Sequence, residues 1–182
     1  LLTAYDDLFA DDYILPFGNL RESAIGKKRA NLVIVTKCPA TLSEQEQDKV
    51  KQKLKVNVPV FFTSIDYDSE VFGVDNSMNV SEIIAKEKVI VAGIAKPKYF
   101  VDYLNSGKDT VMIYPDHHHF LEQEISELNA SAQDKILVTT EKDFVRLNGK
   151  IKSDKLFYLP IKVKFLNSES EFKTIISKTI KP

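Results

Sequence analysis

All three histidines of the chain lie in one tetrapeptide, Asp116-His117-His118-His119, directly after an apolar segment. Histidine is the side chain whose ordinary pKa, ~6.5, lies nearest neutrality, so an imidazole beside a carboxylate suits general-base chemistry or the orientation of another base. Because successive residues point in different directions, at most two of the three imidazoles can serve one site. We predict a functional site here. The alternative is a solvated loop with one histidine packed against Phe120.

A second polar segment, residues 139–147, follows another apolar run and reads Thr-Thr-Glu-Lys-Asp-Phe-Val-Arg-Leu. A threonine at the start of a helix leaves backbone N–H groups unpaired beside basic side chains, which favours an anion. Thr140, Lys142 and Arg146 are therefore candidate ligands of a phosphate or a nucleotide. A capped helix with ion pairs between its own side chains is the equal alternative.

Two further segments carry residue types that could take part in chemistry. Residues 15–22 end in Arg21 and Glu22, and by themselves these adjacent charges predict an exposed turn with a surface ion pair worth ~0–1 kcal/mol. Cys38, the one cysteine, precedes a proline, and no base partner is evident in the sequence. We therefore predict a buried or inert thiol rather than a nucleophile.

Several common catalytic patterns are absent from the sequence. The six glycines fit neither G-x-x-x-x-G-K-[ST] nor G-x-G-x-x-G, so the chain contains no phosphate-binding loop. H-E-x-x-H, G-x-S-x-G and a zinc-type Cys/His array are also missing. We assign no metal ligand from these patterns.

Short β-branched runs alternate with amphipathic stretches, which is typical of an α/β protein with a mostly parallel sheet and flanking helices. In open sheets of this kind ligands bind beyond the carboxyl ends of the strands, where the polar segments above are expected. The predicted strands are 30–36, 58–65, 88–94, 110–114, 136–139 and 156–159. The predicted helices are 43–54, 97–107, 120–128 and 168–180.

The domain organisation is predicted from a change in composition. Residues 66–79 are rich in Asp, Ser, Asn and Gly, which indicates a loop or linker. We therefore expect four parts: a first domain over 1–65, a linker over 66–82, a smaller α/β domain over 83–160, and a return strand with the C-terminal helix over 161–182.

The composition is that of a folded globular chain, with 43% hydrophobic and 28% charged residues. Lys and Arg number 25 against 26 Asp and Glu, so the net charge of −1 gives no reason to expect a nucleic-acid partner. The central apolar run, 89–95, is far shorter than the ~20 residues of a membrane-spanning helix. The N-terminus has neither an initiator Met nor a secretion signal, and it reads as a cut inside a domain.

Five motifs occur in order along the chain: D-Y-I-L-P-x-G-x-L-R-E at 12–22, R-A at 29–30 with V-T-K at 35–37, A-G-I-x-x-P-x-x-F at 92–100, P-D-H-H at 115–118 and T-T-E-K-D-x-V-R-L at 139–147. Together they resemble the tetraacyldisaccharide 4′-kinases, the bacterial lipid A kinases. Two small departures are Asn31, where the family usually has Asp, and Ala95-Lys96, which replace the more usual Gly-Asn.

The resemblance implies a P-loop-kinase-like fold that moves the γ-phosphoryl group of ATP, with Mg²⁺, to the 4′-hydroxyl of tetraacyldisaccharide 1-phosphate. It implies that His117, with Asp116 beside it, is the catalytic-site histidine that supports an aspartate base. Arg21 and Glu22 are implied to line the phosphate and Mg²⁺ region. Such roles suit phosphoryl transfer, in which the protein mainly positions groups and neutralises charge.

The resemblance also implies that half of the enzyme is missing. The Walker A loop, the catalytic aspartate and the paired Mg²⁺-binding aspartates of the family all precede the segment that aligns with Leu1. We therefore expect a partial nucleotide domain followed by a smaller second domain, inactive in isolation, with the missing N-terminal half as its partner. The family acts at the cytoplasmic face of the bacterial inner membrane, which it would reach through that half, and the present chain is expected to be soluble.

Two alternatives remain at this stage. A DHH-type metal-dependent phosphoesterase would use Asp116-His117-His118 together with Asp66 and Asp68, because carboxylates and histidines at strand ends suit Mn²⁺ or Mg²⁺. That family needs further Asp motifs, which the sequence lacks, and the motifs at 18–22 and 139–147 would stay unexplained. A binding or scaffold fragment without enzymatic activity is the third possibility.

Overall fold

The structure, a computed structural model, describes residues 1–152 and 154–180. The chain forms two compact units: unit 1 contains Leu1–Asp66 and the segment from Lys162 onward, and unit 2 contains Tyr67–Ile161. Within the described residues, no helix is both long and apolar enough to cross a membrane.

Unit 1 is built on a four-stranded sheet in the order β1-β2-β3-β10. The strands are β1 (Leu2–Ala4), β2 (Val33–Thr36), β3 (Val60–Tyr67) and β10 (Ile161–Phe165). The first three run parallel, with Ile34 of β2 opposite both Leu2 of β1 and Phe61 of β3. A short 3-10 helix, η1 (Ala24–Arg29), precedes β2.

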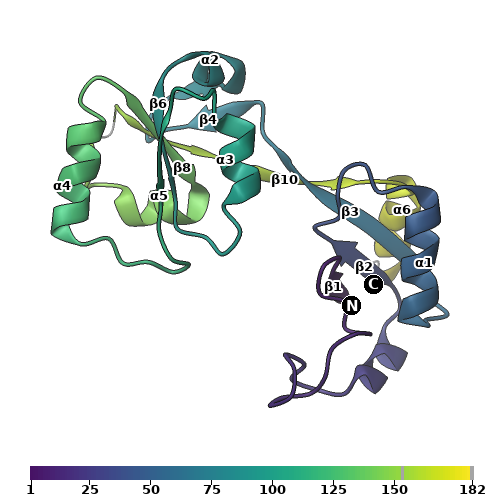
Figure 1. Ribbon diagram of the computed structural model, residues 1–182. Helices are drawn as coiled ribbons and strands as arrows, with labels where there is room; N and C mark the ends of the chain where they lie inside the picture. Colours follow the sequence, from purple (N-terminus) through teal and green to yellow (C-terminus); the bar gives the residue numbers. More distant parts are fainter. Residues whose placement is uncertain (153, 181–182) are drawn as a thin grey trace. The chain divides into compact units, whose positions relative to one another are not determined.

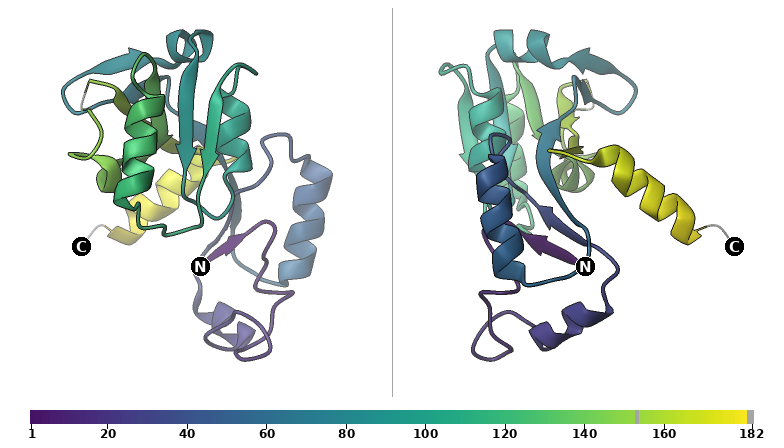
Figure 2. Two further views of the ribbon diagram at one scale, coloured as in Figure 1. Left: turned by 60° about the vertical axis from the view of Figure 1, so that its left-hand side comes forward. Right: turned by 90° about the vertical axis from the view of Figure 1, so that its right-hand side faces the viewer.

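Helices cover both faces of the unit 1 sheet (Figure 2). On one face, Leu54 of α1 (Glu44–Leu54) joins the core cluster that contains Val33 and Phe62. On the other, Phe172 of α6 (Glu169–Ile180) lies 5.3 Å from Phe61, ring centre to ring centre. The start of α1 follows from the sequence, because Ser43 and Glu46 form a capping box in which each side chain accepts the backbone N–H of the other.

Unit 2 is built on a six-stranded sheet in the order β5-β4-β9-β8-β6-β7. Strands β7, β6, β8 and β9 are parallel, whereas β4 pairs antiparallel with both β9 and β5. The predicted α/β class with a mostly parallel sheet is therefore confirmed. The strand bounds are Glu70–Phe72 for β4, Ser77–Asn79 for β5, Lys88–Ala92 for β6, Thr110–Ile113 for β7, Ile136–Thr140 for β8 and Leu156–Leu159 for β9.

Helices lie on both faces of this sheet as well (Figure 1). Successive residues of β6 face opposite sides: Ile90 packs with α2 (Val80–Ala85) and α3 (Lys98–Leu104), whereas Val89 and Val91 pack against the side of α4 (Glu122–Ser131) and α5 (Glu141–Leu147). A strand covered on both sides needs apolar side chains on both faces, and this is why residues 89–94, which follow Lys88 at the start of the strand, read as one apolar run.

The structure corrects the loop or linker expected at 66–82. This segment contains the end of β3, all of β4 and β5, and the start of α2. Strands β4 and β5 form a hairpin with a fully buried Val71, and its turn is closed by a 2.8 Å hydrogen bond from Gly73 N–H to the Asn76 carbonyl. The Asp, Asn and Gly residues do form turns, but strands of three residues are too short to produce a detectable alternation.

Cys38 is buried, as predicted, and its Sγ lies 3.4 Å from the Val35 carbonyl oxygen. Burial raises the pKa of the Cys38 thiol to about 11. At about pH 8 only about one thiol in a thousand is then ionised, and the thiolate is the reactive form.

We expect a disulfide reagent such as DTNB to detect no thiol in the native chain and one after denaturation in guanidinium. Rapid reaction of the native chain would contradict this assignment.

Candidate functional site

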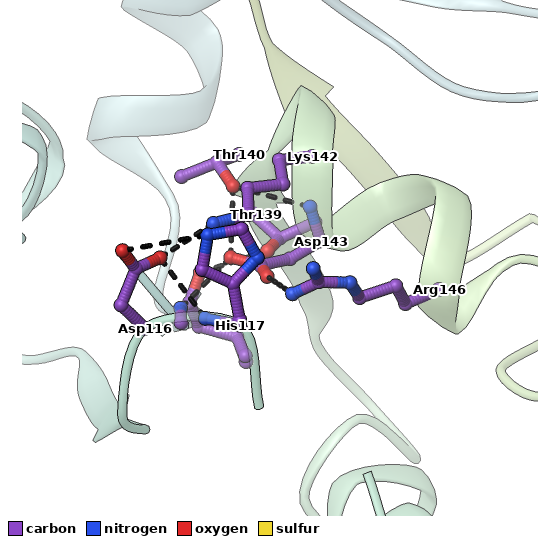
Figure 3. Close-up of polar contacts among 9 residues, drawn as sticks. Asp116, His117, Thr139, Thr140, Lys142, Asp143 and Arg146 are labelled. Atoms are coloured by element: carbon purple, nitrogen blue, oxygen red, sulfur yellow. Dashed lines mark hydrogen bonds and ion pairs between the residues drawn. The ribbon is translucent and has the colours of Figure 1, made fainter. Parts of the chain in front are cut away.

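The polar segments of unit 2 meet at one edge of its sheet. Asp116 and His117 follow β7, and Thr140 ends β8 and is the N-cap of α5. Strands β7 and β8 flank β6, and all three run parallel. Their carboxyl ends therefore lie together, at the position where α/β sheets bind ligands (Figure 3).

Asp143 is the centre of this edge and its side chain is fully buried. Its Oδ2 accepts hydrogen bonds of 2.8 Å from both the Gly93 N–H and the Thr140 hydroxyl, and the Thr140 oxygen accepts the Asp143 N–H at 3.2 Å. A Cβ atom at position 93 would lie 3.0 Å from Asp143 Oδ1, so a glycine best allows this approach. We call Gly93, Thr140, Asp143 and Arg146 the Asp143 cluster.

Two of the predicted phosphate ligands belong to the Asp143 cluster. The hydroxyl of Thr140 is engaged both as donor and as acceptor, and Nη1 of Arg146 lies 3.4 Å from Asp143 Oδ1. The neighbouring Thr139 donates to the Val91 carbonyl at 2.8 Å, which joins β8 to β6. In this structure Thr140 and Arg146 thus bind a buried carboxylate, which corresponds to the helix-cap alternative. A phosphate role for them stays a prediction.

Lys142, the third predicted phosphate ligand, contacts the other candidate site. Its Nζ lies 2.5 Å from Oδ1 of Asp116, and the same oxygen accepts the His117 N–H at 2.9 Å (Figure 3). The hydrogen bond from Lys142 holds the pKa of Asp116 below its usual range, so Asp116 is ionised at neutral pH. The structure therefore brings Asp116, His117 and Lys142 together.

The three histidines have different environments. His118 is half-buried, stacks on Tyr114 with ring centres 4.9 Å apart, and places Nε2 2.8 Å from Glu124 Oε2. It also packs edge-on against Phe120, so the alternative of one histidine packed on that ring describes His118. The side chain of His117 is 75% exposed, and its backbone adopts the left-handed conformation with φ 61°. His119 is exposed as well, so His117 and His119 are the histidines that a ligand can reach, and of these two His117 lies directly beside Asp116.

Arg21 and Glu22 belong to unit 1, whereas His117 belongs to unit 2. Glu22 pairs through both carboxylate oxygens with Arg29 of η1, at 2.8 and 2.7 Å. The surface ion pair expected for this turn thus exists, but its partner is Arg29 instead of the adjacent Arg21. The side chains of the adjacent residues Arg21 and Glu22 point in different directions, whereas the turn of η1 places Arg29 beside Glu22.

The loop before Arg21 has a tightly built backbone. The Asp12 carboxylate accepts the N–H groups of Tyr13 at 2.7 Å and Asn19 at 3.1 Å. A Cβ atom at Gly18 would lie 2.2 Å from Asp12 Oδ1 and 2.3 Å from the Tyr13 carbonyl oxygen, so only glycine fits there. Within the part of the chain that the structure describes, no group of three or more His, Cys, Asp or Glu residues could hold a metal ion.

Sequence reasoning missed two residues of the unit 2 site. Asp143 had no assigned role although Thr140-x-x-Asp143 matches the [ST]-x-x-[DE] pattern of a helix start. Glu124 was also missed, and it accepts the Leu121 N–H at 2.8 Å in addition to its contact with His118. Asp143 could be found from its capping pattern, whereas the contact of Glu124 with His118 depends on the path of the loop between β7 and α4.

Comparison with known proteins gives consistent matches over the whole chain. The tetraacyldisaccharide 4′-kinase of Flavobacterium psychrophilum is 52% identical over 182 residues, covering 97% of this chain and 53% of that protein. The tetraacyldisaccharide 4′-kinase of Flavobacterium johnsoniae is 47% identical and covers 100% of this chain and 54% of that protein. The chain thus spans about half the length of these curated relatives.

A solved structure shares the fold. It is the "apo" form of LpxK from Aquifex aeolicus in complex with ATP, which matches with a TM-score of 0.67 at 23% identity, over 100% of this chain and 52% of that chain. The phosphoesterase alternative finds no support among these matches. The sequence model of the family described as tetraacyldisaccharide-1-P 4′-kinase (LpxK) matches residues 1–181, and the chain therefore belongs to this family.

Proposed function

We propose that the chain is part of an ATP-dependent lipid kinase that phosphorylates the 4′-hydroxyl of tetraacyldisaccharide 1-phosphate in lipid A biosynthesis. The observation that carries this proposal is the family match from residue 1 to residue 181, supported by relatives that are named for this activity. The chain spans about half of their length, so the remaining parts of the kinase belong to the other half.

In this proposal His117 supports the aspartate that removes the proton from the attacking hydroxyl. Its Nε2 lies 3.8 Å from Asp116 Oδ2, which is beyond hydrogen-bond length, and the ring is exposed. The imidazole can therefore bind a second carboxylate, the aspartate base that the family resemblance places outside this chain. Asp116 then has two roles. Its carboxylate accepts the His117 N–H within the loop, and its negative charge lies beside the imidazole.

ATP and Mg²⁺ are the proposed cofactors, and unit 1 offers residues of suitable chemistry. The guanidinium of Arg21 suits a phosphate. Glu22 has the oxygen donors that Mg²⁺ prefers, although both accept hydrogen bonds from Arg29. Glu22 therefore fits the edge of a Mg²⁺ site whose other ligands come from elsewhere. When bound, Mg²⁺ would neutralise charge that develops on the transferred phosphoryl group.

We further propose that the complete protein works at the cytoplasmic face of the bacterial inner membrane. Its substrate is an acylated disaccharide, which partitions into a bilayer because each buried methylene contributes ~0.8 kcal/mol. We assign contact with the membrane to the other half of the protein, which is also the main partner of the present chain.

The test is a phosphoryl-transfer assay with radiolabelled ATP and tetraacyldisaccharide 1-phosphate. We expect no product from the present chain alone, since it has no phosphate-binding loop. We expect product from the complete protein, and from a chimera that joins the N-terminal half of the Flavobacterium psychrophilum kinase to this chain. Robust phosphorylation by the isolated chain, or a complete protein that folds but transfers nothing to the 4′-hydroxyl, would refute the proposal.

A further inference from the structure

The placement of Lys142 is determined by the Asp143 cluster. The buried Asp143 carboxylate joins the first turn of α5 to Gly93, directly after β6, through a 2.8 Å hydrogen bond. Thr140 caps the same turn and binds the same carboxylate. Lys142 therefore projects from a turn that is fixed on both sides, and it reaches toward the β7–α4 loop (Figure 3).

The partner of Lys142 is the carboxylate that precedes His117. Asp116 Oδ1 accepts both the Lys142 ammonium at 2.5 Å and the His117 N–H at 2.9 Å. This single oxygen thus connects α5 to the backbone of the residue that carries the imidazole. The two residues are 26 positions apart, so the contact joins two separate loops of the sheet edge.

His117 needs such a contact because of its backbone. Its φ of 61° lies in the left-handed region, which is unfavourable for residues with a Cβ atom. The hydrogen bond from the His117 N–H to Asp116 stabilises this turn locally. The Lys142 ammonium in turn limits where the Asp116 carboxylate can lie, so the direction of the imidazole depends on Lys142.

We propose that Lys142 is a positioning residue, which holds Asp116 and thereby orients His117, and that it is not a phosphate ligand. The kinetic part of this inference rests on the proposed kinase function, whereas the structural part does not. The whole motif at 139–147 then has one role: Asp143 fixes the helix start, and the fixed helix start presents Lys142 to the histidine loop.

The local charge favours this role over phosphate binding. Two carboxylates, Asp116 and Asp143, contact the cations Lys142 and Arg146, so each cation already has a carboxylate partner. A phosphate at this point would bring further negative charge to two cations that are already paired, and at Lys142 it would have to displace Asp116. Helix α5 is only seven residues long, so its own dipole adds little.

The kinetic test uses the complete protein with Lys142→Met and Lys142→Arg. We expect Lys142→Met to lower kcat about 10- to 100-fold, because a misplaced group far from the bond that breaks loses about this much. KM for ATP should stay within about twofold, and Lys142→Arg, which keeps the charge, should recover most of the rate. Lys135→Met is the matched control. Lys135 also forms a 2.5 Å ion pair, with Glu87, but it lies just before the N-terminal end of β8, whereas Thr140 and the site lie at the C-terminal end.

A second test needs no activity and uses NMR of the present chain. The titratable groups that face Asp116 are Lys142 and His117, and the Lys142 hydrogen bond is the main cause of the lowered pKa of Asp116. Lys142→Met should raise the midpoint of the Asp116 carboxyl titration toward its ordinary value and shift the His117 backbone amide resonance. Lys135→Met should leave both signals unchanged.

The two tests separate the possible failures. An increase in KM for ATP at constant kcat, with an unchanged Asp116 titration, would identify Lys142 as a phosphate ligand and overturn the inference. Unchanged kinetics and an unchanged titration would also overturn it. If the complete protein has no kinase activity but the titration and the amide resonance respond as expected, the proposed function fails while the positioning of Asp116 and His117 by Lys142 stands.

Discussion

In the complete protein, His117→Ala lowers kcat by about 10²- to 10⁴-fold and leaves KM for ATP and for the lipid within about threefold. The reason is that an imidazole that supports the catalytic base acts when the proton moves, not when the substrates bind. His117 is exposed and lies outside the buried core clusters described for unit 2, so its removal should not unfold the chain. Steady-state kinetics of phosphoryl transfer give both parameters.

His119→Ala is the matched control for this experiment. His119 is exposed in the same loop, two positions further along the chain, and the site as described does not use it. We expect its kcat to remain near that of the wild type. Near-normal turnover of His117→Ala, or an equal loss in both variants, would remove His117 from the catalytic role.

The second large effect concerns the stability of unit 2. Lys88 at the start of β6 and Asp109 before β7 form an ion pair of 2.9 Å, and both side chains are fully buried. Asp109 also accepts the N–H groups of Lys88 at 3.0 Å and Ser106 at 2.7 Å. Lys88→Met leaves this carboxylate buried without its ammonium, which typically costs about 3–5 kcal/mol of unfolding free energy.

Hydrogen exchange of the β6 amides measures this loss within unit 2 itself, and urea denaturation followed by circular dichroism measures it for the chain. Lys135→Met removes a partly exposed pair and should cost no more than about 1 kcal/mol. A double variant, Lys88→Met with Asp109→Leu, should regain part of the stability because no buried charge remains unpaired. Equal stability of Lys88→Met and the wild type would show that the pair is dispensable.

The same pair predicts a pH dependence of stability. Burial raises the pKa of Asp109, but hydrogen bonds from Ser106 and Lys88 outweigh it and hold the pKa below its usual range. The unfolded chain then binds the proton more readily than the folded chain, so this contribution is complete above the unfolded pKa of ~3.9 and is lost as the pH falls through the folded pKa. Asp109→Asn should therefore reduce the slope of unfolding free energy against pH below about pH 4.

Much of the fold could be predicted from the sequence because local signals decide it. The run at 89–94 is apolar on both faces and contains most of β6, and the capping box at Ser43 marks the start of α1. The β4–β5 hairpin could not be predicted, since each strand has three residues and pairs through its backbone. The burial of Lys88 could not be predicted from the sequence either, because it depends on an ion pair with Asp109, which lies 21 positions away.

The candidate site could be predicted in part for the same reason. The rule that strand ends carry ligands predicted Asp116, His117 and the 139–147 segment at strand ends, and in the structure these strand ends lie at one edge of the unit 2 sheet. The partners within that edge required three dimensions: Lys142 to Asp116, Asp143 to Gly93 and Glu124 to His118. The variants above test the catalytic role of His117 and the role of Lys142, whereas the phosphate and Mg²⁺ roles of the other named residues remain predictions.

The order in which the ribosome makes this chain gives the division into units a further meaning. Unit 1 is discontinuous, because its sheet needs β10 beside β3 and about 95 residues of unit 2 are synthesised between them. At ~5–20 residues per second, this interval lasts roughly 5–20 s. During that time the edge of β3 that later pairs with β10 has no strand to bond to, while unit 2 is continuous and can fold as soon as it emerges. Nascent chains that stall within residues 67–161 would therefore present an open strand edge, the kind of surface that chaperones protect from aggregation.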